Sequence, residues 1–143
     1  MFSRLLVPAL LLALMLPAGV AEAKTRLVVN CFWAPQHMVC KSILKTWGDW
    51  IAEATEGRVK VTIPPKSVAP PPHQWSSVEK GVVDAAVQFS GLVQDRITGP
   101  LVAMNPFIAT TDSVAMSSAL WETYQKFFPD EVKSVKVMSM WVI

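Results

Sequence analysis

The 143-residue sequence is poor in the residues and motifs on which most protein active sites depend. It contains two histidines, two cysteines and one tyrosine, and its charged residues amount to only 17%. The net charge of +2 gives no strong positive field of the kind that nucleic-acid binders use. The nucleophile elbow G-x-S-x-G, the zinc motif H-E-x-x-H, the Walker loop and the G-x-G-x-x-G fingerprint are all missing. These absences argue against an enzyme, a cofactor and a nucleic-acid partner.

Large hydrophobic side chains are plentiful, but they are distributed unevenly. Six tryptophans and six phenylalanines, together with the low charged fraction, exclude a disordered chain. Residues 1–23 contain 17 apolar residues, whereas residues 24–143 have an ordinary globular composition. The latter segment is long enough for one core of normal size but hardly for two.

The first 23 residues have the organisation of a secretory signal peptide. Arg4 precedes the apolar stretch Leu5–Leu16, and Ala21-Glu22-Ala23 resembles an A-x-A cleavage site. A membrane-spanning helix needs about 20 apolar residues, which is more than this stretch provides. The sequence therefore predicts cleavage near Ala23 and an exported protein of residues 24–143 without a membrane span.

Strands and helices are expected to alternate along residues 24–143. Apolar residues spaced by three or four predict a helix over 40–54 that ends before Gly57. We further predict strands at 27–32, 59–63, 82–89 and 135–143, a short helix at 74–81 and a helix from Asp112 to Phe128. In the short helix, Trp75 and Val78 should face inward. In the helix that follows Asp112, the inward residues should be Met116, Leu120, Tyr124 and Phe127.

This alternation is typical of an α/β fold with a mainly parallel sheet and helices on both of its faces. Such sheets bind ligands just beyond the carboxyl ends of their strands. Here these ends are Asn30–Trp33, Pro64-Pro65 and Gln88–Gly91. The long segment 90–111 between strand and helix is expected to be functional or to contain short elements.

Cys31 and Cys40 allow three interpretations. We favour two buried free thiols, because Cys31 should end a strand and Cys40 should begin a helix. A disulfide is the alternative, and it requires Cα atoms within about 7 Å. A soft metal ion held by Cys31, His37 and Cys40 is the third interpretation, although the spacing C-x5-H-x2-C matches no compact zinc motif.

Three further positions stand near strand ends and leave alternatives open. Trp33 either packs its own loop or forms one wall of a ligand cleft. Gln88 ends an apolar strand, so its amide is either satisfied by nearby backbone groups or presented to a cleft. The segment Asn105-Pro106-Phe107 forms either the floor of a cleft or a simple bend.

Several linked segments resemble the solute-binding subunit of tripartite ATP-independent periplasmic (TRAP) transporters, of the DctP type. Phe32–His37 resembles the end of the family's first strand, and Trp47–Val61 resembles its first helix, T-x-G-R turn and second strand. Gly81–Asp84 is similar to the G-x-x-D that opens the third strand, and Met104–Phe107 to the L-P-F segment of the loop that follows.

This resemblance implies a periplasmic protein without enzymatic activity, built from two α/β lobes joined by a hinge. It would capture a small organic acid and deliver it to a membrane permease driven by an ion gradient. The resemblance places first-lobe ligand contacts at the ends of the first and third strands and in the following loop. The implied ligand-binding residues are Asn30, Phe32, Trp33, Gln88, Phe89, Ser90, Asn105 and Phe107.

Members of this family are longer than the present chain. Their ligand carboxylate pairs with a second-lobe arginine in a K-x-R-like strand, and none of Arg26, Arg58 and Arg96 stands in that motif. We therefore expect residues 24–143 to be a truncated first lobe, with the second lobe absent. The alternative hypothesis is a free-standing, exported one-lobe domain that binds a metal ion or a partner protein.

Overall fold

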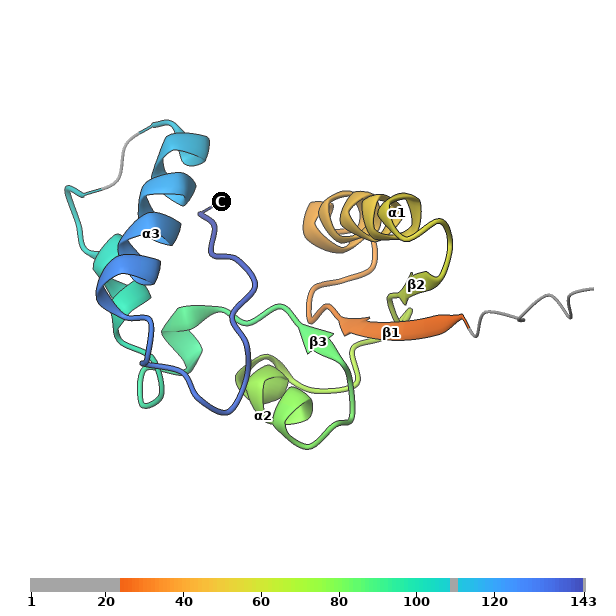
Figure 1. Cartoon of the computed structure of the whole chain (residues 1–143). Coiled ribbons are helices and arrows are strands. Elements are labelled where there is room, and N and C mark those ends of the chain that lie inside the picture. Colours follow the sequence, from red (N-terminus) through yellow and green to blue (C-terminus); the bar gives the residue numbers. More distant parts are fainter. Residues whose placement is uncertain (1–23, 109–110, 143) are drawn as a thin grey trace, which may run out of the picture.

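The computed structural model describes residues 24–108 and 111–142. They form a three-stranded parallel sheet with helices around it and a separate helical region (Figure 1). The strands are β1 (Thr25–Asn30), β2 (Val59–Thr62) and β3 (Ala85–Ala86), and the α-helices are α1 (Leu44–Ala54), α2 (Gln74–Glu79) and α3 (Ser113–Phe127). A π-helix η1 (Val39–Ile43) precedes α1, and the 3-10 helices are η2 (Pro71–His73), η3 (Ser90–Leu92) and η4 (Gly99–Met104).

Strand β1 occupies the centre of the sheet, which has the order β2-β1-β3. Its first half pairs with β2, from Thr25 opposite Val59, and its second half pairs with β3, from Val29 opposite Ala85. Figure 1 shows α1 and α2 on opposite sides of β1. The predicted α/β class with a parallel sheet is therefore confirmed.

The connection from α1 to β2 shows why this unit folds as its sequence predicts. Gly57 has a φ of 79°, the left-handed conformation that ends helices, and its N–H bonds to the Ala52 carbonyl at 2.7 Å. The Thr55 hydroxyl then accepts the Val59 N–H at 3.1 Å and starts β2. Gly48 brings α1 against this strand, since a Cβ there would lie 3.0 Å from the Cβ of Val61.

Two of the predicted strands are wrong in extent or kind. The 82–89 strand shrinks to β3, because the Val82 N–H bonds to the Ser77 carbonyl in the turn after α2 and its side chain is exposed. Residues 135–142 contain no strand. There the Val142 N–H donates to the Ser117 hydroxyl of α3 at 2.8 Å, so a helix side chain takes the place of a neighbouring strand.

The two later helices confirm part of the expected pattern. In α3, the Asp112 carboxylate accepts the Val114 and Ala115 N–H groups, as an N-cap does. The predicted inner residues Met116, Leu120 and Tyr124 of α3 are buried, but Phe127 is 63% exposed. In α2, Trp75 and Val78 are both half-buried, and Trp75 packs against the cluster of Val93, Ile97 and Tyr124, so its inward position is confirmed in part. Gln74 and Ser77 are the buried residues of that helix.

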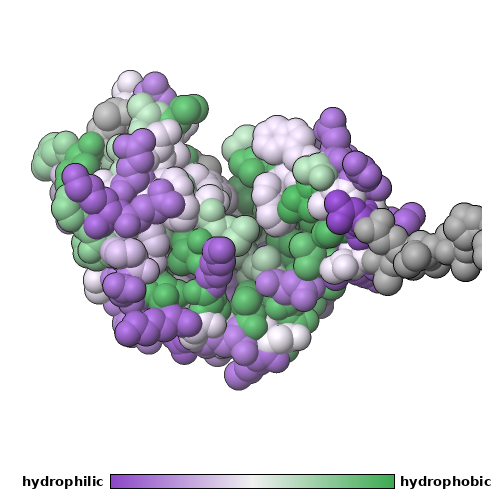
Figure 2. All heavy atoms as spheres, viewed as in Figure 1, coloured by the Kyte–Doolittle hydropathy of each residue, from purple (hydrophilic) through white to green (hydrophobic). Residues whose placement is uncertain are grey.

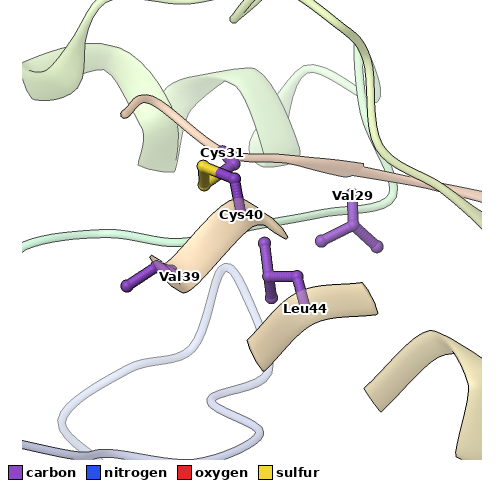
Figure 3. Close-up of a cluster of buried hydrophobic side chains, with 5 residues drawn as sticks. All are labelled: Val29, Cys31, Val39, Cys40 and Leu44. Atoms are coloured by element: carbon purple, nitrogen blue, oxygen red, sulfur yellow. A yellow bond between two sulfur atoms is a disulfide. The ribbon is translucent and has the colours of Figure 1, made fainter. Parts of the chain in front are cut away.

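Hydrophobic side chains form two clusters. The first joins β1 to η1 and α1 through Val29, Cys31, Val39, Cys40 and Leu44 (Figure 3). The second joins the segment after η3 to α3 through Val93, Ile97 and Tyr124. The last residues connect them, since Met140 packs on the second cluster and Trp141 on the first. The surface is hollowed between the α1 side and the α3 side (Figure 2).

Within the described residues, no helix has the length and apolar character needed to cross a membrane. The predicted signal peptide, residues 1–23, lies outside the described part of the chain.

Candidate ligand-binding site

A cavity of about 390 Å³ opens at the carboxyl end of β1. One wall is the segment directly after β1, and the other is the segment after β2. We call them the aromatic wall (residues 32–35) and the proline wall (residues 65–71). The lining residues are Phe32, Trp33, Ala34, Pro35, Pro65, Lys66, Ser67, Val68, Ala69, Pro70 and Pro71. The cavity thus stands where parallel sheets bind ligands.

Stacked rings give the aromatic wall its shape. The Phe32 and Trp33 rings lie 3.9 Å apart between centroids with an interplanar angle of 26°. The His37 ring stacks with Trp33 at 5.0 Å and 7°. Its Nδ1 accepts the Val39 N–H at 3.3 Å. Because Phe32 and Trp33 line the cavity, this wall brings aromatic side chains to a ligand there.

The proline wall is held from beneath by a buried polar network. Asn30 and Gln74 have no exposed surface, and the Asn30 Nδ2 donates to the Gln74 Oε1 at 2.7 Å. The Gln74 Nε2 donates to the Ala69 carbonyl at 2.7 Å, and the Asn30 Oδ1 accepts the Val68 N–H at 3.1 Å. The Ser67 hydroxyl accepts from Asn30 and donates to the Ala69 carbonyl at 2.6 Å. These bonds fix the backbone of the wall from Ser67 to Pro70.

Four of the eight sequence-predicted site residues lie at this cavity or directly beneath it. Phe32 and Trp33 line it. Asn30 is buried and contacts the lining residues Ser67 and Val68. Gln88 is satisfied by backbone groups: its Oε1 accepts the Trp75 N–H at 3.0 Å and its Nε2 donates to the Phe89 carbonyl at 3.0 Å. Asn30 and Gln88 thus support the cavity without lining it.

The other four residues lie away from the cavity. Phe89 precedes η3 with its ring against Gly91, and Ser90 begins that helix. The Asn105 amide donates to the Val102 carbonyl at 3.2 Å. Phe107 is fully exposed and has a φ of 69°. The structure brings none of these four to the lining of the cavity.

Sequence reasoning missed most of the proline wall. The sequence predicts a strand end at Pro64-Pro65 but assigns no ligand contact to the residues that follow it. Lys66 is the one charged residue among those that line the cavity. The proline wall could have been predicted from its position in the chain. Segments that follow neighbouring parallel strands face each other at the same edge of the sheet.

The prediction of two free thiols is wrong, since Cys31 and Cys40 form a disulfide. Cys31 directly follows β1, and Cys40 lies in the first turn of η1, which packs back on that strand and brings the Cα atoms to 5.8 Å. The bridge uses both sulfurs and so removes the metal site of Cys31, His37 and Cys40. Within residues 24–108 and 111–142, no group of three His, Cys, Asp or Glu side chains is placed to hold a metal ion.

A second cavity, of about 350 Å³, lies between α2 and the segment that follows η3, and Trp75, Lys80 and Arg96 contribute to its lining. Arg96 is already engaged, because its Nη1 donates to both Glu79 carboxylate oxygens at 2.9–3.0 Å. Hydrogen bonds from Ser134, Arg96 and Trp75 hold the pKa of Glu79 below its ordinary value against a smaller effect of burial. The charge of Arg96 in this cavity is therefore balanced by Glu79.

Another acidic group, Glu131, joins the segment around Thr98 to the segment that follows α3. Its carboxylate accepts the Thr98 N–H at 2.6 Å and the Gly99 N–H at 3.0 Å. Burial acts to raise the pKa of Glu131, but these bonds and that of the Thr98 hydroxyl outweigh it, so the pKa is lowered. In the neighbouring cluster, burial raises the pKa of Tyr124. Both groups are structural and lie outside the first cavity.

Known proteins resemble the chain in sequence and in structure. The sequence is 43% identical over 143 residues to the "Outer membrane transporter protein TsaT" of Comamonas testosteroni, and it spans 42% of that protein's length. A TRAP periplasmic solute-binding protein from Bordetella bronchiseptica, solved with bound (R)- and (S)-mandelate, superimposes with a TM-score of 0.76 and 30% identity. A TRAP solute-binding protein from Rhodoferax ferrireducens, in complex with copurified benzoate, superimposes with a TM-score of 0.75 and is 28% identical in sequence.

Each of the two structural matches covers 82% of this chain, but only 38% and 37% of the respective solved chains. No protein-family model matches the sequence. The predicted resemblance to TRAP solute-binding proteins is nevertheless confirmed, because the sheet and helices described above superimpose on part of such proteins. The chain has the fold of a partial TRAP solute-binding protein lobe.

Proposed function

We propose that this chain, with the fold of a TRAP-type solute-binding protein, supplies one face of a binding site for a small aromatic carboxylate. The observation that carries the proposal is the cavity at the carboxyl end of β1, with Phe32 and Trp33 on one wall. A flat ring can stack on these side chains. Lys66, on the facing wall, supplies a positive charge for a carboxylate.

The similar solved structures support this ligand class. Mandelate and benzoate, the molecules bound in two of them, each combine one aromatic ring with one carboxylate. The cavity of about 390 Å³ falls within the range of about 300–1,000 Å³ typical of small-molecule sites. The proposal is therefore consistent in the position, size and chemistry of the site.

The remaining parts of the proposal concern the protein as a whole. Residues 1–23 direct export and are removed near Ala23, and residues 24–143 act in the periplasm as the first lobe of a solute-binding protein. The bound acid passes to the membrane subunits of a TRAP transporter, without chemical change. Of the eight residues carried over from the family, Phe32 and Trp33 are the proposed direct contacts in this cavity, and Asn30 and Gln88 support it from behind. Phe89, Ser90, Asn105 and Phe107 stay predictions from the resemblance.

A benzoate titration followed by NMR tests the ligand site. The six tryptophans give separate indole N–H signals, which Trp→Phe variants assign. We expect benzoate at millimolar concentration to shift the Trp33 signal, because a ring stacked on the indole changes its local magnetic field. Because this chain supplies only one face of the site, part of the ligand stays in water and binding should be weak. Chemical-shift changes in NMR spectra can detect such weak binding.

Trp50 provides the matched control, because it is 64% exposed on α1 and does not line the cavity. Its signal should stay in place, and Trp50→Phe should leave the titration unchanged, whereas Trp33→Ala should abolish saturable shifts near the cavity. Equal movement of both signals, or no movement of the Trp33 signal, contradicts the proposed site.

A further inference from the structure

The Cys31–Cys40 disulfide lies directly behind the aromatic wall. It is part of the first hydrophobic cluster, where Val29, Val39 and Leu44 surround it (Figure 3). Cys31 and Cys40 are 3% and 6% exposed. The bond therefore ties the end of β1 to the first turn of η1 inside the core, and solvent reaches little of it.

The disulfide closes the short loop that carries the aromatic side chains. Phe32 and Trp33 immediately follow Cys31, and His37 precedes Cys40 by three residues. The Cys40 Sγ lies 3.7 Å from the Trp33 carbonyl oxygen. The bridge thus contacts the backbone of the residue whose ring forms the centre of the wall.

The hydrogen bonds of this loop join residues that are close in sequence. The His37 N–H donates to the Ala34 carbonyl at 2.8 Å, and the Val39 N–H donates to the His37 Nδ1. Bonds of this kind shape the loop but do not attach it to the opposite wall. Its position relative to the proline wall depends on the packing of Trp33 against the first cluster and on the two ends of the loop, which the disulfide fixes to each other.

We propose that the Cys31–Cys40 disulfide is a positioning element of the ligand site, which holds Phe32 and Trp33 in their stacked arrangement facing the proline wall. The inference rests on the proposed function of the cavity and adds a dependence of that site on the oxidised state. The proline wall does not share this dependence, since hydrogen bonds from Asn30 and Gln74 hold it.

The test compares the chain with and without the bridge. A phosphine reductant supplies two electrons, and water supplies two protons and the oxygen of the phosphine oxide, so the S–S bond becomes two thiols. We expect the reduced chain and the Cys31→Ser/Cys40→Ser variant to bind benzoate about ten-fold more weakly, because binding must then order two aromatic side chains. The benzoate dependence of the Trp33 indole signal reports the affinity.

A ligand-free readout keeps this inference separate from the proposed function. Contacts between the Phe32 and Trp33 rings, seen as nuclear Overhauser effects, should weaken on reduction. Those between Trp121 and Tyr124 on α3, whose rings stack at 6.1 Å, should persist and show that the chain remains folded. If the double variant does not fold, the reduced wild-type chain at low temperature replaces it.

The outcomes distinguish the two claims. A Trp33 signal that ignores benzoate in the oxidised chain contradicts the proposed function alone. Equal benzoate affinity in the oxidised and reduced chains overturns the positioning role, and so do Phe32–Trp33 contacts that reduction leaves unchanged. Weaker binding together with weaker ring contacts, while the α3 contacts persist, supports it.

Discussion

The aromatic wall of the cavity is closed by a covalent bond between Cys31 and Cys40, whereas the proline wall rests on hydrogen bonds from Asn30, Ser67 and Gln74. Both walls follow strands of the same parallel sheet, and both are irregular in backbone. Irregular segments have no ladder of their own to fix them, so each needs a separate attachment. The aromatic wall thus depends on a covalent bond, and the proline wall depends on a set of hydrogen bonds.

The two attachments respond to different changes. The disulfide acts largely by restricting the unfolded chain, and it is sensitive to reduction. The polar network acts in the folded chain, and it is sensitive to the loss of any one partner, because a buried amide left without a bond is costly. Removing a member whose loss leaves a buried amide without a bond should therefore cost much stability, whereas removing a member whose partners keep other bonds should cost little. The disulfide is a single bond and is lost as a whole.

Removing Gln74 should give the largest effect on stability. Its amide donates to the Ala69 carbonyl and accepts from Asn30, both at 2.7 Å, with no exposed surface. Gln74→Ala leaves the buried Asn30 amide with a missing partner and creates a cavity. We expect the free energy of unfolding, measured by urea denaturation, to fall by about 3–4 kcal/mol.

The control uses the same residue type at the surface. The Gln94 amide donates to the Gly91 carbonyl at 3.1 Å, and its side chain is exposed. Gln94→Ala should change the free energy of unfolding by less than about 0.5 kcal/mol. A loss below about 1 kcal/mol for Gln74→Ala would show that the proline wall does not depend on the network.

These partners explain how far the site could be predicted from sequence. Gln88 is predicted from its own residue pattern, because a polar side chain at the end of an apolar strand needs a partner, whereas Asn30 is predicted only from its place at a strand end in the family resemblance. Their partners could not be found in the same way. Gln74 is 44 positions from Asn30, and only the folded chain brings the two amides together.

The fold itself was predictable where local signals agree. Three local signals agree with the structure: the apolar period of α1, Gly57 at its end and the Asp112 cap of α3. The structure of segment 135–142 was not predictable. Its apolar pattern fits a strand, but the Val142 N–H bonds to the Ser117 hydroxyl of α3 instead of to a neighbouring strand. An apolar pattern alone does not decide how the backbone is paired, because distant parts of the chain supply the partners.

Loss of the disulfide should be the second-largest effect. The bridge spans a sequence separation of 9. For a closed loop of about ten residues, the loop-entropy relation gives a stabilisation of about 2.5–3 kcal/mol. Cys31→Ser/Cys40→Ser should lower the free energy of unfolding by this amount in urea.

Reduction provides the internal control for this prediction. A reductant should lower the stability of the wild-type chain to nearly that of the double variant, and it should leave the double variant unchanged. Equal stability of the oxidised and reduced wild-type chains would contradict the predicted contribution of the disulfide.

The smallest of the three effects is expected for Ser67→Ala, and it separates the members of the network. The Ser67 hydroxyl donates to the Ala69 carbonyl at 2.6 Å, but Ala69 also accepts from Gln74, and Asn30 also donates to Gln74. Each partner of Ser67 thus keeps one bond, so the loss in unfolding free energy should be about 1 kcal/mol. Ser118→Ala on the exposed side of α3 is the control and should be nearly neutral. A loss as large as that of Gln74→Ala would instead place Ser67 at the centre of the network, because only a hydroxyl that both amides require could cost so much.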